Sequence, residues 1–293
     1  MKGFMIKRIT SILLLLIVVM NSAIAFADAV DGDVIISLGD NLTQAEREAI
    51  LKEFGEPKNA QIIVTTNAEE HEYLGGIIPA KQIGSIAISS VMITFTEKGS
   101  GLNVEASDRI TYITEQNYTN ALITAGIEDA DIKITSPRNA SGTAALTGIM
   151  KAYEISTGKA ISEEVKKVAN EEMIRSAELG EEIGEEKAAE IMSKIKLEVA
   201  NRKPETTEEV REIVIGIVKN LDVSLSDEQT EKLVELYDKM KSLDIDWNKV
   251  ANRIEDFASK ASDYLASEEG QNFLQKLKEV IIVIIDWFAS LFR

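Results

Sequence analysis

Residues 141–158 run Ser-Gly-Thr-Ala-Ala-Leu-Thr-Gly-Ile-Met-Lys-Ala-Tyr-Glu-Ile-Ser-Thr-Gly, and the character of the chain changes at the end of this stretch. Within it, Ser141, Ala145, Gly148 and Ala152 recur at helical spacing and form one stripe of small side chains. Small side chains allow a helix to lie close against a sheet, and such a stripe more often packs against a neighbour than binds a ligand. The stretch therefore predicts a helix packed on a β-sheet.

Composition differs on the two sides of residue 158. Thirteen of the 17 glycines and three of the four prolines occur at or before it, where short apolar runs alternate with capped helical patterns. The strands predicted there cover residues 34–38, 61–65, 85–97, 102–105 and 131–135, with helices at 43–54 and 114–125. The alternation changes phase at Ser89-Ser90, which indicates a bulge or two abutting strands within 85–97.

From residue 162 onward every segment has a helical pattern. The predicted helices cover residues 162–176, 181–202, 206–220, 226–242, 246–266 and 268–292, with capping boxes at Thr206 and Ser226. We therefore expect an α+β chain, in which a mixed α/β domain (residues 28–158) is followed by an all-α helical bundle domain (residues 159–293).

The N-terminal segment has the features of a secretory signal peptide. Lys2, Lys7 and Arg8 precede the apolar run 12–20, and Ala25-Phe26-Ala27 offers a cleavage site. Nine apolar residues are too few for an ordinary membrane-spanning helix. We expect residues 1–27 to be removed and the protein to be secreted, which places it outside the cytoplasm at the cell envelope.

Charge and residue usage exclude several classes of function. The chain has no cysteine and a single histidine, which excludes disulfides, cysteine nucleophiles and multi-histidine metal sites. Its formal net charge is −17, and removal of residues 1–27, with three bases and no acids, would make it −20. Nucleic acid is therefore not an expected partner. An anionic surface would also repel the chain unless divalent cations intervene.

Two short segments are candidate binding sites. One holds Glu70, His71, Glu72 and Tyr73, where carboxylates beside the histidine could serve proton transfer or metal binding. The zincin pattern is missing, because Gly75 stands where its second histidine would be. The simpler interpretation is a capped helical turn with an exposed histidine.

The second candidate segment is Ser141, Gly142 and Thr143, at the start of the small-residue helix. Nucleotide-binding and serine-nucleophile motifs are incomplete in this sequence. The S-x-x-K pattern at 156–159 lacks its companion motif, recurs at 193–196, and fails the test for a phosphate-binding loop. We therefore predict no catalytic residues, no metal ligands and no cofactor.

The C-terminal segment carries an apolar helical face. Its members are Phe273, Leu277, Ile281, Ile284, Trp287 and Phe288. Charged residues interrupt the segment, which disfavours a transmembrane helix. Three interpretations stay open: the face closes the helical bundle, lies on a membrane surface, or docks on a protein partner.

Several short segments along the chain resemble the YpuA-like family of exported proteins of Gram-positive bacteria, known as domain of unknown function 1002. They are Thr66 to Gly75, Gln82 to Ser85, Ala87 to Ser90, Lys98 to Val104, Asn120 to Gly126, Ser141 to Glu154, and Asp244 to Trp247. The resemblance implies export and this architecture, and it carries no established reaction and no catalytic residues.

We therefore expect a non-enzymatic, exported module that binds an envelope component or a protein partner. One alternative is a hydrolase of an envelope polymer that uses carboxylates near His71. Another is a membrane-surface protein that acts through its C-terminal amphipathic helix.

Overall fold

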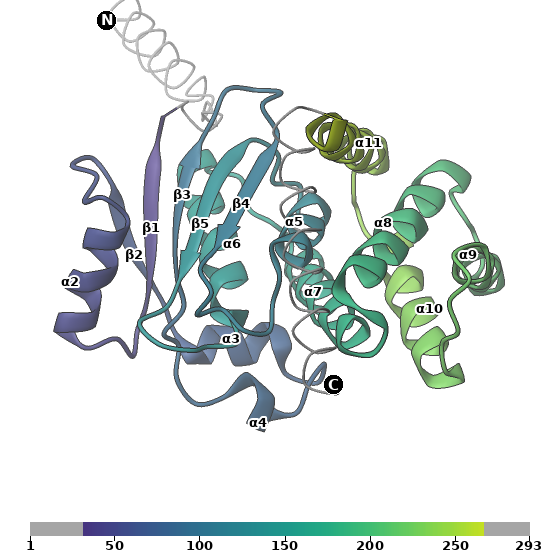
Figure 1. Ribbon diagram of the computed structural model, residues 1–293, viewed down its shortest axis with the longest axis horizontal. Helices are drawn as coiled ribbons and strands as arrows, with labels where there is room; N and C mark the ends of the chain where they lie inside the picture. The colour runs from purple at the N-terminus through teal and green to yellow at the C-terminus, as the bar shows by residue number, and fades with distance from the viewer. Residues whose placement is uncertain (1–31, 267–293) are drawn as a thin grey trace, which may run out of the picture.

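A computed structural model describes residues 32–266 of the chain, and a mixed five-stranded sheet is its first layer (Figure 1). The strands are β1 (Val34–Gly39), β2 (Gln61–Thr65), β3 (Ser90–Phe95), β4 (Leu102–Ala106) and β5 (Ala130–Thr135), in the order β2-β1-β3-β5-β4. The pairs β1–β2 and β4–β5 are parallel, and each is connected through a helix, α2 (Gln44–Glu53) or α5 (Glu115–Thr124). The central strand β3 is antiparallel to both of its neighbours.

Four of the five predicted strands are confirmed within one or two residues, and the prediction for 85–97 is wrong at its N-terminal end. Only Ser90–Phe95 form the strand. Residues 86–89 instead run as irregular backbone across the end of β1, where the carbonyl of Ala87 accepts a hydrogen bond from the N–H of Asn41 (3.1 Å). The phase change at Ser89-Ser90 thus marks the N-terminal end of β3.

Helices cover the two faces of the sheet unequally. On one face, Ile50 and Phe54 at the end of α2 pack on Ile36 and Leu38 of β1. On the other face lie α3 (Asn67–Leu74), α5 and α6 (Thr143–Thr157), around a large apolar core to which β1, β3, β4 and β5 contribute. A short helix, α4 (Ala80–Ile83), follows α3.

The small-residue stripe lies where the sequence predicts. Helix α6 packs on β1, β2 and β3, and Gly148 faces β1. A Cβ atom built on Gly148 would lie 2.8 Å from Ser37 Oγ and 3.1 Å from Thr65 Oγ1. The close approach of helix and sheet therefore requires glycine at this position.

The C-terminal part is helical, as expected, and the overall fold is α+β. Its helices are α7 (Glu163–Ile183), α8 (Glu185–Arg202), α9 (Thr207–Asn220), α10 (Asp227–Lys241) and α11 (Trp247–Ala266). Helix α7 extends seven residues beyond its predicted end, and α8 begins four residues later than predicted, at Glu185, after its N-cap Gly184. The capping boxes at Thr206 and Ser226 are confirmed.

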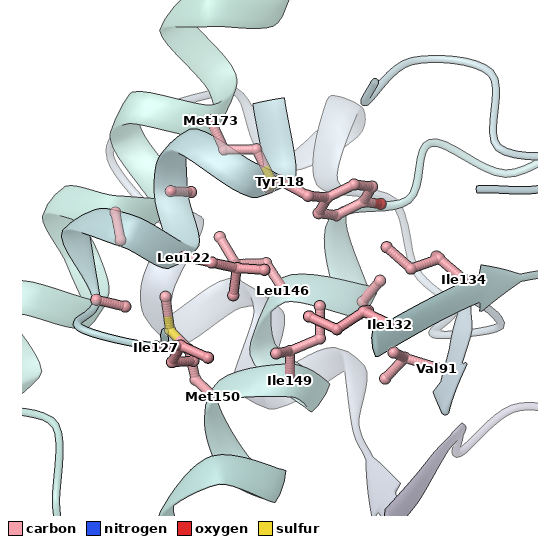
Figure 2. Packing of buried hydrophobic residues seen from close by; sticks show 14 of the residues in the cluster. Val91, Tyr118, Leu122, Ile127, Ile132, Ile134, Leu146, Ile149, Met150 and Met173 are labelled. Carbon is pink, nitrogen blue, oxygen red and sulfur yellow. The ribbon is translucent and has the colours of Figure 1, made fainter. Parts of the chain in front are cut away.

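One apolar core crosses residue 158. Met173 and Ile174 of α7 belong to the same cluster as Tyr118 and Leu122 of α5 (Figure 2). A second core fills the space among α7, α8, α9 and α10. Helix α7 therefore contributes to both cores, and the domain boundary at residue 158 stays a prediction.

Two predictions concern residues outside the described range. The signal peptide (residues 1–27) and the apolar face at Phe273, Leu277, Ile281, Ile284, Trp287 and Phe288 both lie there. Among residues 32–266, no helix combines the length and apolar character that crossing a membrane requires.

Candidate functional site

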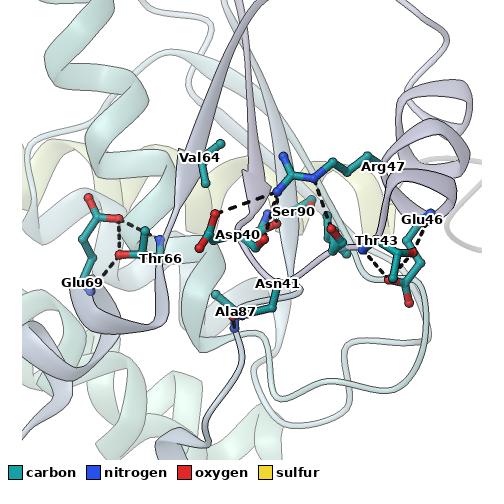
Figure 3. Close-up of polar contacts among 12 residues, drawn as sticks. Asp40, Asn41, Thr43, Glu46, Arg47, Val64, Thr66, Glu69, Ala87 and Ser90 are labelled. Atoms are coloured by element: carbon teal, nitrogen blue, oxygen red, sulfur yellow. Dashed lines mark hydrogen bonds and ion pairs between the residues drawn. The ribbon is translucent and has the colours of Figure 1, made fainter.

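Four strands point in one direction, because β1 and β5 are both antiparallel to β3 and pair in parallel with β2 and β4. Their carboxyl ends meet at one edge of the sheet, which we call the carboxyl edge, and open α/β sheets bind their ligands at such an edge. Figure 3 shows part of it. Asn41 Oδ1 accepts a hydrogen bond from the N–H of Ala87 (2.8 Å), and Ser90 Oγ accepts one from the N–H of Gly39 (3.2 Å).

Helix α3 begins directly after β2 at this edge. Thr66 and Glu69 form a capping box that satisfies backbone N–H groups of the first turn (Figure 3). Glu69 also pairs with Lys151 of α6 (2.6 Å), and Lys151 donates a second hydrogen bond to the carbonyl of Val64 (2.8 Å). These contacts fix α3 against α6.

The structure brings the two candidate segments together at Glu70. Its side chain is buried at the contact of α3 with α6, with 2% of the residue exposed. Thr143 Oγ1 donates to Glu70 Oε1 (2.9 Å), and Asn67 Nδ2 donates to Glu70 Oε2 (3.1 Å). Ser141 Oγ lies 3.0 Å from Thr143 Oγ1 and extends the network. Burial raises the pKa of the Glu70 carboxyl above its ordinary value, against the effect of these hydrogen bonds.

Gly142 has a conformational role beside this network. Its φ of 97° lies in the left-handed region, and a Cβ atom there would overlap the hydroxyl of Tyr118. That hydroxyl donates to the carbonyl of Gly142 (2.7 Å). Burial, and then the nearby charge of Glu70, raise the pKa of Tyr118. The buried side chain of Tyr118 thus fixes the N-cap residue of α6 through this hydrogen bond.

The other residues of the first candidate segment point elsewhere. The Nε2 atom of His71 lies 2.9 Å from the carbonyl oxygen of Gly84, so this nitrogen carries the donated proton. Glu72 is exposed, and Tyr73 lies beneath Lys166 of α7, with Nζ 5.7 Å from the ring centroid. Successive residues of a helix are rotated by about 100°, which separates the side chains.

The four side chains of this segment therefore do not converge on one point. No three acidic or histidine side chains in the described part of the chain come close enough to hold an ion. What the carboxyl edge provides is one buried, hydrogen-bonded carboxyl group and a polar framework around it.

A second buried carboxyl group was missed by the sequence reasoning. Glu172 of α7 and Lys196 of α8 form an ion pair (2.5 Å) with both side chains fully buried. Thr124 Oγ1 donates to Glu172 Oε2 (2.6 Å), and Lys196 Nζ donates to the carbonyl of Asn120 (2.7 Å). Burial raises the pKa of Glu172 and lowers that of Lys196. The signal in the sequence was a lysine on the apolar face that Met192, Ile195 and Val199 define.

Two hollows among the described residues are not lined by Glu70. One of about 350 Å³ is bordered by the end of α5, the α6–α7 connection and the start of α11. A larger groove of about 700 Å³ lies among α5, α8 and α11, and we call it the α5–α8 groove.

These features define a class: an α+β protein in which a mixed sheet and a helical layer share one core, with Glu70 buried in the sheet layer and Glu172 fully buried in the helical layer. The chain belongs to the family described as protein of unknown function DUF1002, whose model matches residues 38–257. It is 44% identical over 294 residues to the Bacillus subtilis (strain 168) protein named "Uncharacterized protein YpuA", with the full length of both chains covered. No solved structure matches the chain.

Proposed function

We propose that this chain is an exported protein of the cell envelope that works by binding rather than by catalysis. Export is supported by the signal-peptide pattern of residues 1–27. The family to which the chain belongs has no assigned function, so it neither adds nor removes an activity. Binding is supported by the way in which the candidate catalytic groups are arranged.

One observation carries the preference for binding. Glu70 is the only residue of its segment that turns into the protein, and both of its carboxyl oxygens accept hydrogen bonds. A general acid or base must reach the proton that it transfers, directly or through one water. Glu70 is enclosed, while Glu72 is exposed and the His71 ring donates to a backbone carbonyl. The three groups therefore do not face a shared space.

The open half of the sheet offers a surface for a partner. On the face that bears α2, strands β4 and β5 present Asn103, Glu105, Asp131 and Lys133, all of them exposed. Asn103 pairs with Asp131 in the strand register, and Glu105 pairs with Lys133, with an ion-pair distance of 3.8 Å. Glu105 and Asp131 give this surface carboxylates that a divalent cation could bridge to an anionic envelope polymer.

Co-sedimentation tests the proposal. Residues 28–293 are mixed with isolated cell walls or anionic vesicles, with Ca²⁺ or with a chelator. We expect the protein to pellet with walls in Ca²⁺. Glu105→Gln with Asp131→Asn should lower the bound fraction several-fold, because the bridging carboxylates are removed. The matched control, Glu212→Gln with Glu235→Gln, makes the same charge change at exposed positions of the helical layer.

Two results would contradict the proposal. One is recovery of the protein in the supernatant under all conditions. The other is release of soluble wall fragments that Glu70→Gln or His71→Ala abolishes, because that result would favour the hydrolase alternative.

A further inference from the structure

The floor of the α5–α8 groove is apolar. Ala189 and Leu197 of α8 are half-buried, and Ile254 of α11 is buried at one end of the groove. Gln116 and Asn120 of α5 form the facing wall. Leu197 packs against the small cluster of Ile254, Val250 and Ile123. The floor is therefore continuous with the core between α5 and α11.

The rim of the groove is acidic. Glu185, Glu186 and Glu190 line it together with one cation, Lys194. Lys194 pairs with Glu190 (2.7 Å). Glu185 and Glu186 are exposed and form no ion pair with any residue in the described range. An occupant with an apolar face and cations beside it would match both the floor and the rim.

The chain supplies such a segment beyond Ala266. Only Ser267 to Gly270 separate Ala266, the last described residue of α11, from residue 271, where the segment begins. The apolar face at Phe273, Leu277, Ile281, Ile284, Trp287 and Phe288 follows it, and Lys276 and Lys278 stand near its start. A helix of 23 residues would be about 34 Å long, more than the roughly 18 Å that separates the groove-lining residues Glu185 and Leu197 along α8.

We propose that the α5–α8 groove is the docking site of the chain's own C-terminal segment, residues 271–293. Docking buries the apolar face of the segment against Ala189, Leu197 and Ile254, and brings Lys276 toward the unpaired carboxylates of the rim. The helix that precedes the segment, α11, already lines one end of the groove through Ile254, so the segment is close in the chain to its docking site. This inference does not depend on the envelope association proposed above.

The absence of cysteine from the sequence makes a direct test simple, because no native cysteine competes with the engineered pair. Ala189→Cys is combined in turn with Leu277→Cys, Ile281→Cys, Ile284→Cys or Phe288→Cys in the full mature chain without lipid. Asp286→Cys, on the opposite side of the predicted helix, is the matched control. We expect an intramolecular disulfide with one or two adjacent positions of the apolar face, and none with Asp286→Cys.

A second measurement does not require a disulfide. The single variant Ala189→Cys should react with a maleimide about tenfold more slowly than the same variant carrying Ile281→Asp and Ile284→Asp, since docking covers the groove. Both aspartates lie in the segment itself and leave the described core unchanged.

Three results would overturn the proposal. Disulfide-linked dimers would assign the groove to a second copy of the chain. Equal disulfide formation by Asp286→Cys and the apolar positions would mean that the segment does not dock with a fixed face. Rapid labelling of Ala189→Cys, with vesicle binding that is lost in a chain truncated after Gly270, would assign the apolar face to a membrane.

Discussion

The two layers of the protein each bury a glutamate, and they satisfy it by different means. In the sheet layer, Glu70 receives hydrogen bonds from neutral donors, the amide of Asn67 and the hydroxyl of Thr143. In the helical layer, Glu172 is paired with Lys196 and receives a hydrogen bond from Thr124. Burial raises the pKa of both carboxyl groups.

This difference determines how each site responds to change. Neutral donors leave a buried carboxyl group able to take up a proton when solvation of its charge is lost. A buried cation instead makes each charge dependent on the other, so removal of one partner leaves an uncompensated charge in the interior. The helical layer should therefore be sensitive to mutation at its ion pair, and the sheet layer should be sensitive to pH at Glu70.

The largest expected effect is at the ion pair. Lys196→Met leaves the Glu172 carboxylate buried without its cation and should lower the free energy of unfolding by ~3–5 kcal/mol. The double variant Glu172→Leu, Lys196→Met should recover most of this loss, because no unpaired charge remains. Urea denaturation followed by circular dichroism measures both. Equal destabilisation by the single and double variants would show that packing, and not the unpaired charge, dominates.

A smaller effect is expected where α6 meets β1. Gly148→Ala places a methyl group against Ser37 and Thr65 and should lower the free energy of unfolding by ~1–3 kcal/mol. Gly216→Ala in α9 is the matched control, since a Cβ atom there meets no other atom within 4 Å. That change should raise helix stability by ~0.5–1 kcal/mol. The same sign for both variants in urea denaturation would contradict the close approach of α6 to the sheet.

The smallest effect, and the most specific, is the pH dependence of Glu70. Because its folded-state pKa is raised, the protonated form stabilises the fold. That contribution is complete below the unfolded pKa of about 4.5 and is lost as pH rises through the folded pKa. Glu70→Gln keeps a neutral group at every pH, so it should gain stability relative to the parent chain as pH rises.

Urea midpoints from about pH 4 to pH 8 measure this difference. Glu172 and the overall acidity of the chain are common to both proteins and cancel in the comparison. A difference that does not vary with pH would mean that Glu70 titrates in the folded protein as it does in the unfolded chain.

The sequence was most informative about local structure. Capping boxes at Thr206 and Ser226 depend on residues three positions apart, and both are confirmed. The predicted strand boundary was wrong at residues 85–89. There Asn41, which is distant in sequence, accepts a hydrogen bond from the N–H of Ala87 and donates one to its carbonyl. Alternation of apolar residues could not reveal that contact.

The candidate site was predicted in its parts but not in its arrangement. Glu70 and Thr143 stand in the two segments that the sequence singled out, yet they are 73 positions apart and meet only where α3 packs on α6. His71, Glu72 and Tyr73 were grouped with Glu70 because they are adjacent in sequence, and the rotation of the helix separates them.

The sequence by itself determined most of the helices and strands, the α+β order of the chain, the family and the stripe that fits α6 to the sheet. These follow from patterns with a short period, which neighbouring residues encode. The tertiary structure alone decided that α7 joins the core of the sheet, that Lys196 finds Glu172, and that Glu70 is enclosed. Each of these depends on the approach of distant segments, where burial changes the free energy of every polar group that it encloses.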